Sequence, residues 1–428
     1  MAGVTARADE PAPPPAPSAA KLSLQDALAR MRERGFDVLT ADAAVRAAEG
    51  DAMTASAFPN PLVSGGGGHT FHYDPNQCAQ SGCSATQWSG SLSDQGLLAD
   101  LLIGKRRLRA QVADAALAAT RLQRDDAIRT LSALVAKAWV DTAVAGALER
   151  TAQDAAHSAS EISKLVDLRW HAGDVSEADA ARAETAKLEA EQAVDAAHEN
   201  LAQAKAALGF LLGEREATPD FEVESQLPPC VAPADYAAAS QAELLERARA
   251  GRQDLAAAKE AVSSADLGVS LAKRQRIPDI ALGGSYVQEG TGNSAIQPPT
   301  AALALTVPIP IFYQGEGEVA HAQAVLDAQH IALSRLDAQI ASDVASSFAS
   351  WQSAQSRVSR MESTTLARAQ RAEELVDYQY RRGAASLLEL LDAQRTFTTT
   401  QAEYRQNVGD WWSALYQLET TTGKEPNP

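Results

Sequence analysis

Apolar residues recur at helical spacing over two long stretches without proline, positions 76–218 and 311–425. Proline breaks the hydrogen bonds of a helix, so its absence allows both stretches to be almost wholly helical. Glycine is scarce as well, because positions 105–172 contain only Gly146 and positions 318–382 contain none. A helix of about 65 residues is roughly 100 Å long. The pattern therefore predicts two long helical rods, which no compact globular domain needs.

The second rod carries apolar residues seven positions apart in two consecutive runs. Such spacing is typical of coiled coils, and ordinary antiparallel helix packing produces a similar stripe. The residues are Leu326, Leu333, Ile340, Val344, Trp351 and Val358. Both kinds of packing stay open at this point, and both require partner helices along the stripe.

One segment of helix, lone glycine and second helix occurs twice, as LVDLRWHAGDVSEADAARAE at 165–184 and LVDYQYRRGAASLLELLDAQ at 375–394. A glycine accepts the left-handed backbone that is needed just past a helix end. Gly173 and Gly383 are therefore the predicted tip turns of two helical hairpins.

The duplication extends upstream of the hairpins. SLQDALARMRERGFDVLTADAAV from Ser23 matches SQAELLERARAGRQDLAAAKEAV from Ser240, and each copy runs on to a proline, Pro61 or Pro278. Matching segments in the same order show a tandem duplication. The expected layout is a disordered Pro/Ala-rich segment 1–22, a first repeat 23–213, a linker 214–239, a second repeat 240–423 and a tail 424–428.

After each of these prolines the hydrophobic period changes from helical to extended. Segments of about 9–11 residues match strands that cross a bilayer at a tilt. Four strands cannot close a barrel alone, so other chains must pair their edges. The predicted strands are 61–73, 86–94, 278–288 and 300–312.

Composition and charge exclude several classes of protein. The formal net charge of −17 argues against nucleic acid as a partner, because its phosphates would be repelled. It suits a solvated surface or a cation path. No run of 18 apolar residues occurs, since Lys137 and Asp141 interrupt the best stretch, so no transmembrane helix is expected. The first residues contain no apolar segment, and no signal peptide is visible.

Motifs for catalysis are missing from the sequence. We find no His-Glu-x-x-His, Gly-x-Ser-x-Gly, P-loop or dinucleotide-binding glycine motif, so we expect no enzyme, no cofactor and no metal site. His69 and His72 could touch a metal, but such histidines are more often exposed loop residues. Cys78 and Cys83 could form a disulfide within a loop if the compartment is oxidising, or stay as two free thiols.

Three motifs of the chain match one known family. The hairpin tip YQYRRGAASLLELLDAQ resembles that of the TolC family of outer-membrane efflux channels, and the likeness in layout covers about Lys21 to Lys424. PIPIF followed by QGEGEVAHA, and IGKRRLRA after the first strand pair, look like the strand-to-helix junctions of its heavy-metal-efflux branch. The expected fold is mainly α with a small β part, a TolC-like arrangement of long antiparallel helices with an internal duplication.

The resemblance implies a homotrimer in the outer membrane. Three chains would contribute four strands each to one twelve-stranded barrel embedded in outer-membrane lipid, and their helices would form a periplasmic tunnel. Such a channel is a passive export duct of a tripartite system. Its partners would be a periplasmic membrane-fusion adaptor and an inner-membrane pump, of the RND type or similar.

The resemblance also assigns roles at the tips. Glu389 and Asp392 match the acids that line the closed constriction, and Asp179 and Tyr380 match partners whose hydrogen bond helps to hold neighbouring helices shut. The sequence departs from some members at Ala385, where they carry an arginine. Without the motif, Glu389 and Asp392 would be interpreted as a solvated acidic face.

A soluble periplasmic coiled-coil scaffold or tether without a pore is the alternative function. It explains the rods equally well, but it gives no reason for TAALALTVPIPIF where the duplication predicts strands. The cargo stays open, because an acidic lumen suits both metal ions and cationic organic compounds.

Overall fold

The computed structural model describes residues 21–71, 84–215, 221–224, 226–288 and 299–426. The chain divides into two compact units, and each is built from both repeats. Unit 1 comprises residues 1–38, 129–241 and 345–428, and unit 2 comprises residues 39–128 and 242–344. The duplicated halves are therefore interleaved rather than folded as separate bodies.

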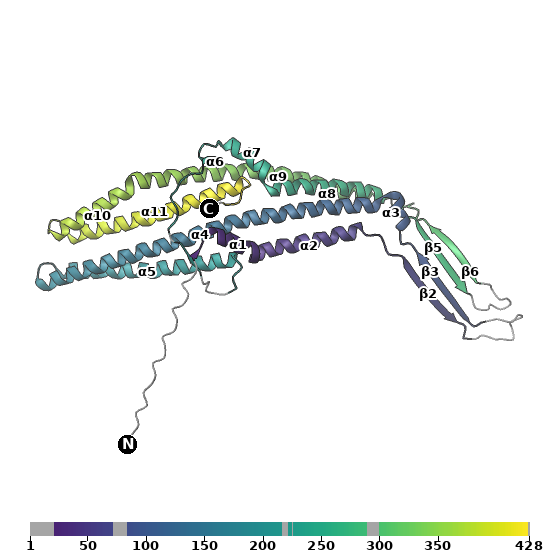
Figure 1. Ribbon diagram of the computed structural model, residues 1–428, viewed down its shortest axis with the longest axis horizontal. Helices are drawn as coiled ribbons and strands as arrows, with labels where there is room; N and C mark the ends of the chain where they lie inside the picture. Colours follow the sequence, from purple (N-terminus) through teal and green to yellow (C-terminus); the bar gives the residue numbers. More distant parts are fainter. Residues whose placement is uncertain (1–20, 72–83, 216–220, 225, 289–298, 427–428) are drawn as a thin grey trace, which may run out of the picture. The chain divides into compact units, whose positions relative to one another are not determined.

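Unit 1 contains the two hairpins. One is formed by the end of α4 (Lys105–Ala172) with α5 (Glu177–Leu211), and the other by α10 (Leu366–Arg381) with α11 (Leu387–Thr421) (Figure 1). Unit 1 also contains the short elements β1 (Lys21–Leu22), α1 (Leu24–Arg34), β4 (Glu222–Val223) and α6 (Ala234–Ala237).

The expected rod at 318–382 is interrupted once. α9 (Glu316–Arg360) passes into one π-helical turn, η2 (Met361–Thr365), before α10 begins. A π turn inserts an extra residue into a helix and cannot be inferred from apolar spacing alone. The matching rod α4 of the first repeat runs through all of its 68 residues as an α-helix.

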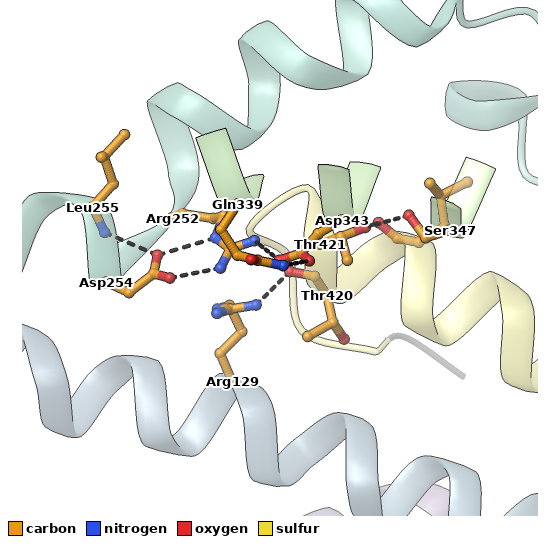
Figure 2. Close-up of polar contacts among 10 residues, drawn as sticks. Arg129, Arg252, Asp254, Leu255, Gln339, Asp343, Ser347, Thr420 and Thr421 are labelled. Atoms are coloured by element: carbon orange, nitrogen blue, oxygen red, sulfur yellow. Dashed lines mark hydrogen bonds and ion pairs between the residues drawn. The ribbon is translucent and has the colours of Figure 1, made fainter. Parts of the chain in front are cut away.

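Two buried side chains of unit 1 donate hydrogen bonds to backbone carbonyls. Trp139 donates its indole N–H to the carbonyl of Leu22 at 2.9 Å, where β1 pairs in parallel with β4. The buried Arg129 donates to the carbonyl of Thr420 at 2.5 Å, as Figure 2 shows. Because an unpaired buried polar group costs about 1–3 kcal/mol, these bonds fix the ends of α11 and the amino-terminal strand.

Unit 2 contains α2 (Phe36–Ser56), α3 (Leu97–Ile103), α7 (Gln241–Gly251), α8 (Gln253–Gln275) and the antiparallel sheet. The strand order is β2-β3-β5-β6 (Figure 1). The strands are β2 (Leu62–His69), β3 (Thr86–Ser93), β5 (Ala281–Gln288) and β6 (Thr300–Thr306).

The fourth strand is shorter than the sequence suggests. β6 ends at Thr306, whereas the extended pattern continues through PIPIF to Phe312. Pro308 and Pro310 lack the N–H that a strand ladder needs, so pairing stops before them.

A buried arginine organises the α7–α8 junction of unit 2. Arg252 precedes α8 and donates two hydrogen bonds to the carboxylate of Asp254, at 3.0 and 2.6 Å, and one to Asp343 at 3.2 Å (Figure 2). These hydrogen bonds raise the pKa of its guanidinium although burial lowers it. The charge is thus buried with its partners, as a buried charge requires.

One described helix, α4, is long and apolar enough to cross a membrane by length and composition alone. Of the apolar window in it, 44 % is buried inside the protein, and core helices of soluble proteins pass the same test. Lys137 and Asp141 interrupt this stretch, which is why the sequence predicts no transmembrane helix here. In the structure these two residues form an ion pair at 2.6 Å on the helix surface.

Candidate functional site: hairpin tips and a two-faced sheet

The two predicted tip glycines lie at equivalent turns. Gly173 follows α4 with φ of +86°, and Gly383 follows α10 with φ of +75°. Each next residue donates its N–H back to a helix carbonyl at 2.9 Å, Asp174 to Arg169 and Ala384 to Gln379. This left-handed closure needs glycine, because a Cβ would be strained at such φ values.

The second helix of each hairpin begins with a serine cap. The hydroxyl of Ser176 accepts from the backbone N–H of Asp179, and that of Ser386 accepts from the N–H of Glu389. At Ser386 the capping box is complete, since the Glu389 carboxylate accepts from the Ser386 backbone N–H at 2.7 Å. The local sequences SEAD and SLLE thus fix where both helices start.

A small apolar cluster joins the two hairpins at their tips. It combines side chains from all four hairpin helices, and Val166 and Leu390 are 0 % and 1 % exposed. The full set is Ile162, Val166, Ala183, Tyr380, Leu387 and Leu390. One chain therefore presents its two duplicated tips as a packed pair.

Tyr380 lies in this cluster with its hydroxyl unsatisfied. The side chain is 4 % exposed, and the guanidinium of Arg169 lies 5.0 Å from the ring centroid. Its Oη has no hydrogen-bond partner among the described residues. A buried hydroxyl without a partner is costly, so a rearrangement of the cluster that brings this hydroxyl to an acceptor would be favoured.

Asp179 does not bond to Tyr380 within the chain. Its carboxylate accepts from the hydroxyl of Ser176 at 2.8 Å and from Arg182 at 3.2 Å. The expected pair is thus not assembled inside a single chain. The resemblance places the two residues on neighbouring helices, so their hydrogen bond would have to form between two chains.

The two predicted constriction acids are both solvent-exposed. Glu389 and Asp392 stand one helical turn apart near the start of α11. The hydrogen bond from the Ser386 backbone, reinforced by its hydroxyl, lowers the pKa of Glu389. Glu389 is thus a capping residue as well as a candidate lumen acid, a dual role that the tip motif alone does not reveal.

Other polar contacts near the tips were not anticipated from the sequence. Ser163 of α4 donates to Glu184 of α5 at 3.0 Å, which lowers the pKa of that carboxyl, and Gln394 of α11 donates to Ser158 at 2.6 Å. The guanidinium of Arg169, four residues before Gly173, stacks on the ring of Tyr380. Single polar residues on long amphipathic helices give no signal that separates such contacts from solvated positions.

The sheet of unit 2 has two chemically different faces. In antiparallel pairing, directly opposite residues share a face. The register pairs Val63 with Leu92, Leu92 with Gly284, and Gly284 with Leu303. On this face, the exposed large side chains are Val63, Trp88, Leu92, Leu282, Tyr286, Leu303 and Leu305.

The opposite face of the same sheet carries mostly small and polar residues, and Leu62 and Val287 are the large apolar residues on it. Ser64 lies opposite Ser91, and their hydroxyls are 2.7 Å apart. Ser91 in turn lies opposite Ser285, which pairs with Ala302. The glycine run of β2, whose alternation was weak in the sequence, contributes Gly66 and Gly68 to this polar face. A sheet with one exposed apolar face and one polar face suits a boundary between lipid and water.

The predicted disulfide and one candidate histidine lie outside the described residues. These are Cys78, Cys83 and His72. His69 lies at the end of β2, where its ring is 3.3 Å from the hydroxyl of Thr86. Within the described part of the chain, no group of three or more His, Cys, Asp or Glu side chains could hold a metal ion.

Comparison with known proteins agrees with this geometry. The family model "Outer membrane efflux protein" matches residues 27–214 and 244–424. A curated relative, the cobalt-zinc-cadmium resistance protein CzcC of Cupriavidus metallidurans, is 24% identical over 424 residues, covering 96% of this chain and 92% of its own.

Solved structures share the fold. CusC has a TM-score of 0.75 at 19% identity, with 94% of this chain and 92% of that chain covered. The CmeC outer membrane channel of Campylobacter jejuni has a TM-score of 0.76 at 16% identity, with 95% and 87% covered. The two family segments account for both repeats, so the chain belongs to the outer membrane efflux protein family and has its TolC-like fold.

Proposed function

We propose that three copies of this chain form a passive export duct across the outer membrane. The two-faced sheet is the observation that carries this proposal. Its edge strands, β2 and β6, each pair on one side only within the chain. In a bilayer every backbone polar group must be paired, so each β2 would pair with the β6 of a neighbour until twelve strands close.

In this assembly the apolar face meets lipid and the polar face lines the pore. Exposed side chains such as Leu303 and Trp88, 85% and 64% exposed in the single chain, would be covered by acyl chains. Serine and glycine on the other face leave a wide, wet lumen. A soluble scaffold would have no use for such a sheet, and membership of the efflux family removes that alternative.

The paired hairpins would form the periplasmic end of the duct, with Gly173 and Gly383 at its mouth. Six hairpins from three chains would ring the opening, with Glu389 and Asp392 facing the constriction and Tyr380 and Asp179 holding adjacent hairpins shut. Within the part of the chain that the structure describes, the Tyr380 hydroxyl is buried and unsatisfied, so this bond requires the side chain to turn out of the tip cluster toward the neighbouring hairpin. A periplasmic adaptor that binds the open arrangement better than the closed one would open the duct.

Metal cations are the cargo that we propose. A relative named for cobalt, zinc and cadmium resistance aligns with nearly the whole chain, and the net charge of −17 favours cations. The chain has no nucleotide motif, so an inner-membrane pump must supply the energy. We expect that pump to be of the RND type or similar, joined to the duct by a membrane-fusion adaptor.

Planar-bilayer recording of the purified protein tests the duct itself. We expect a detergent-requiring trimer with low conductance in its closed state and block by millimolar divalent cations from the tip side. Replacing Glu389 and Asp392 together by alanine should weaken that block. A monomer that inserts no channel would refute the duct, whereas unchanged block in the double variant would refute only the acidic ring.

The cargo requires a separate experiment in cells. A strain that lacks the gene should lose resistance to one or more of cobalt, zinc and cadmium, and the intact chain should restore it. Sensitivity to cationic dyes without any sensitivity to these metals would show that the cargo is organic.

A further inference from the structure

Three chain segments of unit 2 converge where the sheet meets the helices. Lys105, the first residue of α4, donates to the carbonyl of Ile277 at 2.6 Å and to Asp279 at 2.8 Å. Arg276, just after α8, donates to the carbonyl of Gln314 at 2.8 Å. The start of α4, the end of α8 and the segment after β6 therefore lie together.

The short helix α3 belongs to the same junction. Asp94, which follows β3, exchanges two hydrogen bonds with Leu282 of β5, at 3.1 and 2.9 Å. Its carboxylate also accepts from the N–H of Leu98, so α3 starts directly at the sheet end. Helix α3 and the segment after β6 thus leave the sheet at the same end, since β3 and β6 run in the same direction.

This junction exposes large apolar side chains on both segments. Leu101 and Leu102 of α3 are 62% and 72% exposed, and Ile309, Ile311 and Phe312 are 77%, 71% and 101% exposed. In β6 and beyond, apolar residues continue at every second position past the last paired residue. The apolar face of the sheet is therefore extended by about one further layer of side chains at this end.

Exposed cations lie on the helix ends that form this junction. Arg107 is the third residue of α4, and Lys273 and Arg274 are in the last turn of α8. All three are exposed, and the structure gives them no ion-pair partner in the part of the chain that it describes. Acids of this junction are paired with other cations, as in Lys105–Asp279 and Arg276–Glu316. In a chain with a net charge of −17, three further cations outside these ion pairs require a reason.

We propose that this surface, the junction collar (Leu101, Leu102, Arg107, Lys273, Arg274, Ile309, Ile311 and Phe312), binds the headgroups of anionic phospholipids. The apolar residues continue the lipid-facing sheet into the acyl boundary, and the cations reach the phosphates just beyond it. Long basic side chains are suited to this position because their stems pack on apolar surface while their charges stay at the headgroups.

Continuity with the apolar face of the sheet selects lipid over a protein partner. A second copy of this anionic chain could also bring carboxylates to the cations, but a phospholipid leaflet offers phosphates at the depth where the strands end and acyl chains beside the exposed apolar residues. A basic residue near an anionic surface contributes about 1 kcal/mol, equivalent to about 5-fold in affinity. Removing all three cations should therefore weaken binding by up to roughly 100-fold.

The test uses the full-length trimer in neutral detergent, titrated with phosphatidylglycerol or with phosphatidylcholine and followed by native mass spectrometry. The junction variant combines Arg107→Gln, Lys273→Gln and Arg274→Gln. The matched control, Arg150→Gln with Arg335→Gln and Arg368→Gln, removes the same charge from exposed helix positions away from the collar.

We expect phosphatidylglycerol to bind the parent and the control more tightly than phosphatidylcholine does, and the junction variant to lose that preference. Inorganic phosphate at millimolar concentration should not compete. Equal binding of both lipids by the parent, or unchanged preference in the junction variant, would overturn the proposal. So would competition by phosphate, which indicates a simple ion site, or loss of the trimer in the junction variant with lipid binding intact, which indicates a contact between copies.

Channel conductance in the same preparations distinguishes a failure of the lipid proposal from a failure of the proposed export function. A junction variant that conducts normally but has lost its lipid preference supports the collar and leaves the export function untouched.

Discussion

At the scale of single residues, Glu389 shows how one carboxylate serves folding and the lumen together. Its hydrogen bonds to Ser386 keep its folded-state pKa below the ordinary value of 4.5. A group with a lowered pKa stabilises the fold above its unfolded pKa and loses that contribution as pH falls through the folded value. The cap at the second tip should therefore weaken only in acid.

Glu389→Gln tests this assignment, because glutamine retains the capping geometry but not the charge. We expect the parent to be more stable than the variant at neutral pH, and the difference to close as the pH falls below the ordinary pKa of 4.5 and through the lowered folded pKa. Hydrogen exchange of the peptide that spans 383–390, measured from pH 7 to 3, reports the local opening. A difference that is independent of pH would show that the charge contributes nothing to the cap.

Gly409 permits close helix contact inside unit 1. A Cβ placed on it would collide with Cγ2 of Val144, because α11 approaches α4 there. Gly409→Ala should therefore destabilise the protein by about 1–3 kcal/mol, the usual cost of overpacking. Gly268 lies in helix α8 with nothing near its Cβ position, so Gly268→Ala should stabilise by about 0.5–1 kcal/mol.

Thermal unfolding of the two variants beside the parent measures both effects, and their opposite signs are the prediction. Equal shifts would mean that helix propensity, and not the contact with Val144, decides the stability at Gly409.

The cysteines make a further prediction at this scale. Cys230 is a free thiol whose pKa burial raises to about 12, while Cys78 and Cys83 are expected to be bridged. Denatured, unreduced protein should then show one reactive thiol per chain, and native protein should react slowly because the thiolate is scarce. Three thiols after denaturation would exclude the disulfide.

At the scale of elements, the sequence predicted the features that occur in both repeats and missed those that occur in only one. Helix starts, tip glycines and strand positions follow from local patterns that the duplication displays twice. The π turn at 361–365, the stacking of Arg169 on Tyr380 and the early end of β6 depend on tertiary contacts or on the two prolines after β6, and each occurs in one repeat only. The two faces of the sheet were hidden because glycine carries no side chain to alternate.

The π turn predicts an unusual tolerance to deletion. Because a π turn holds one residue more than an α-helical turn, removing Ser363 should restore a continuous α-helix and leave Tyr380 in the tip cluster. Removing Ala369 from the regular part of α10 should instead rotate the tip by about 100° and expel Tyr380.

Trimer yield and melting temperature after purification compare the two deletions. We expect the first to resemble the parent and the second to lose several degrees or fail to assemble. If both deletions are equally harmful, the π turn is required for a reason other than helix register.

At the scale of the whole molecule, the interleaved repeats connect the sheet with the hairpin tips through continuous helices. α4 and α9 each contribute residues to both compact units, so one continuous helix from each repeat links the sheet-bearing unit with the hairpin-bearing unit. Duplication supplies two such links and two tips per chain. Three chains would then present six tips, and each closing contact would be repeated three times.

The last prediction concerns that repetition. Tyr380 has a buried hydroxyl without a partner among the described residues, whereas the Asp179 side chain is partly exposed beside its serine cap. If the hydroxyl donates to the Asp179 of a neighbouring chain, each bond contributes roughly 1.5–3 kcal/mol to the closed state. Three copies together would bias the closed-to-open equilibrium by several kcal/mol, enough to reverse it.

Three variants distinguish a hydrogen bond between chains from a hydroxyl that stays unpartnered: Tyr380→Phe, Asp179→Ala and the double variant. If the hydrogen bond joins two chains, both single variants should raise single-channel conductance. The double variant should then add little, because either change removes the same bond. An unpartnered hydroxyl predicts the opposite for Tyr380→Phe, namely higher thermal stability with unchanged conductance, since the ring still packs and a desolvated group is gone. Additive effects of the two substitutions would show that each residue acts on the closed state separately and that no shared bond holds the tips.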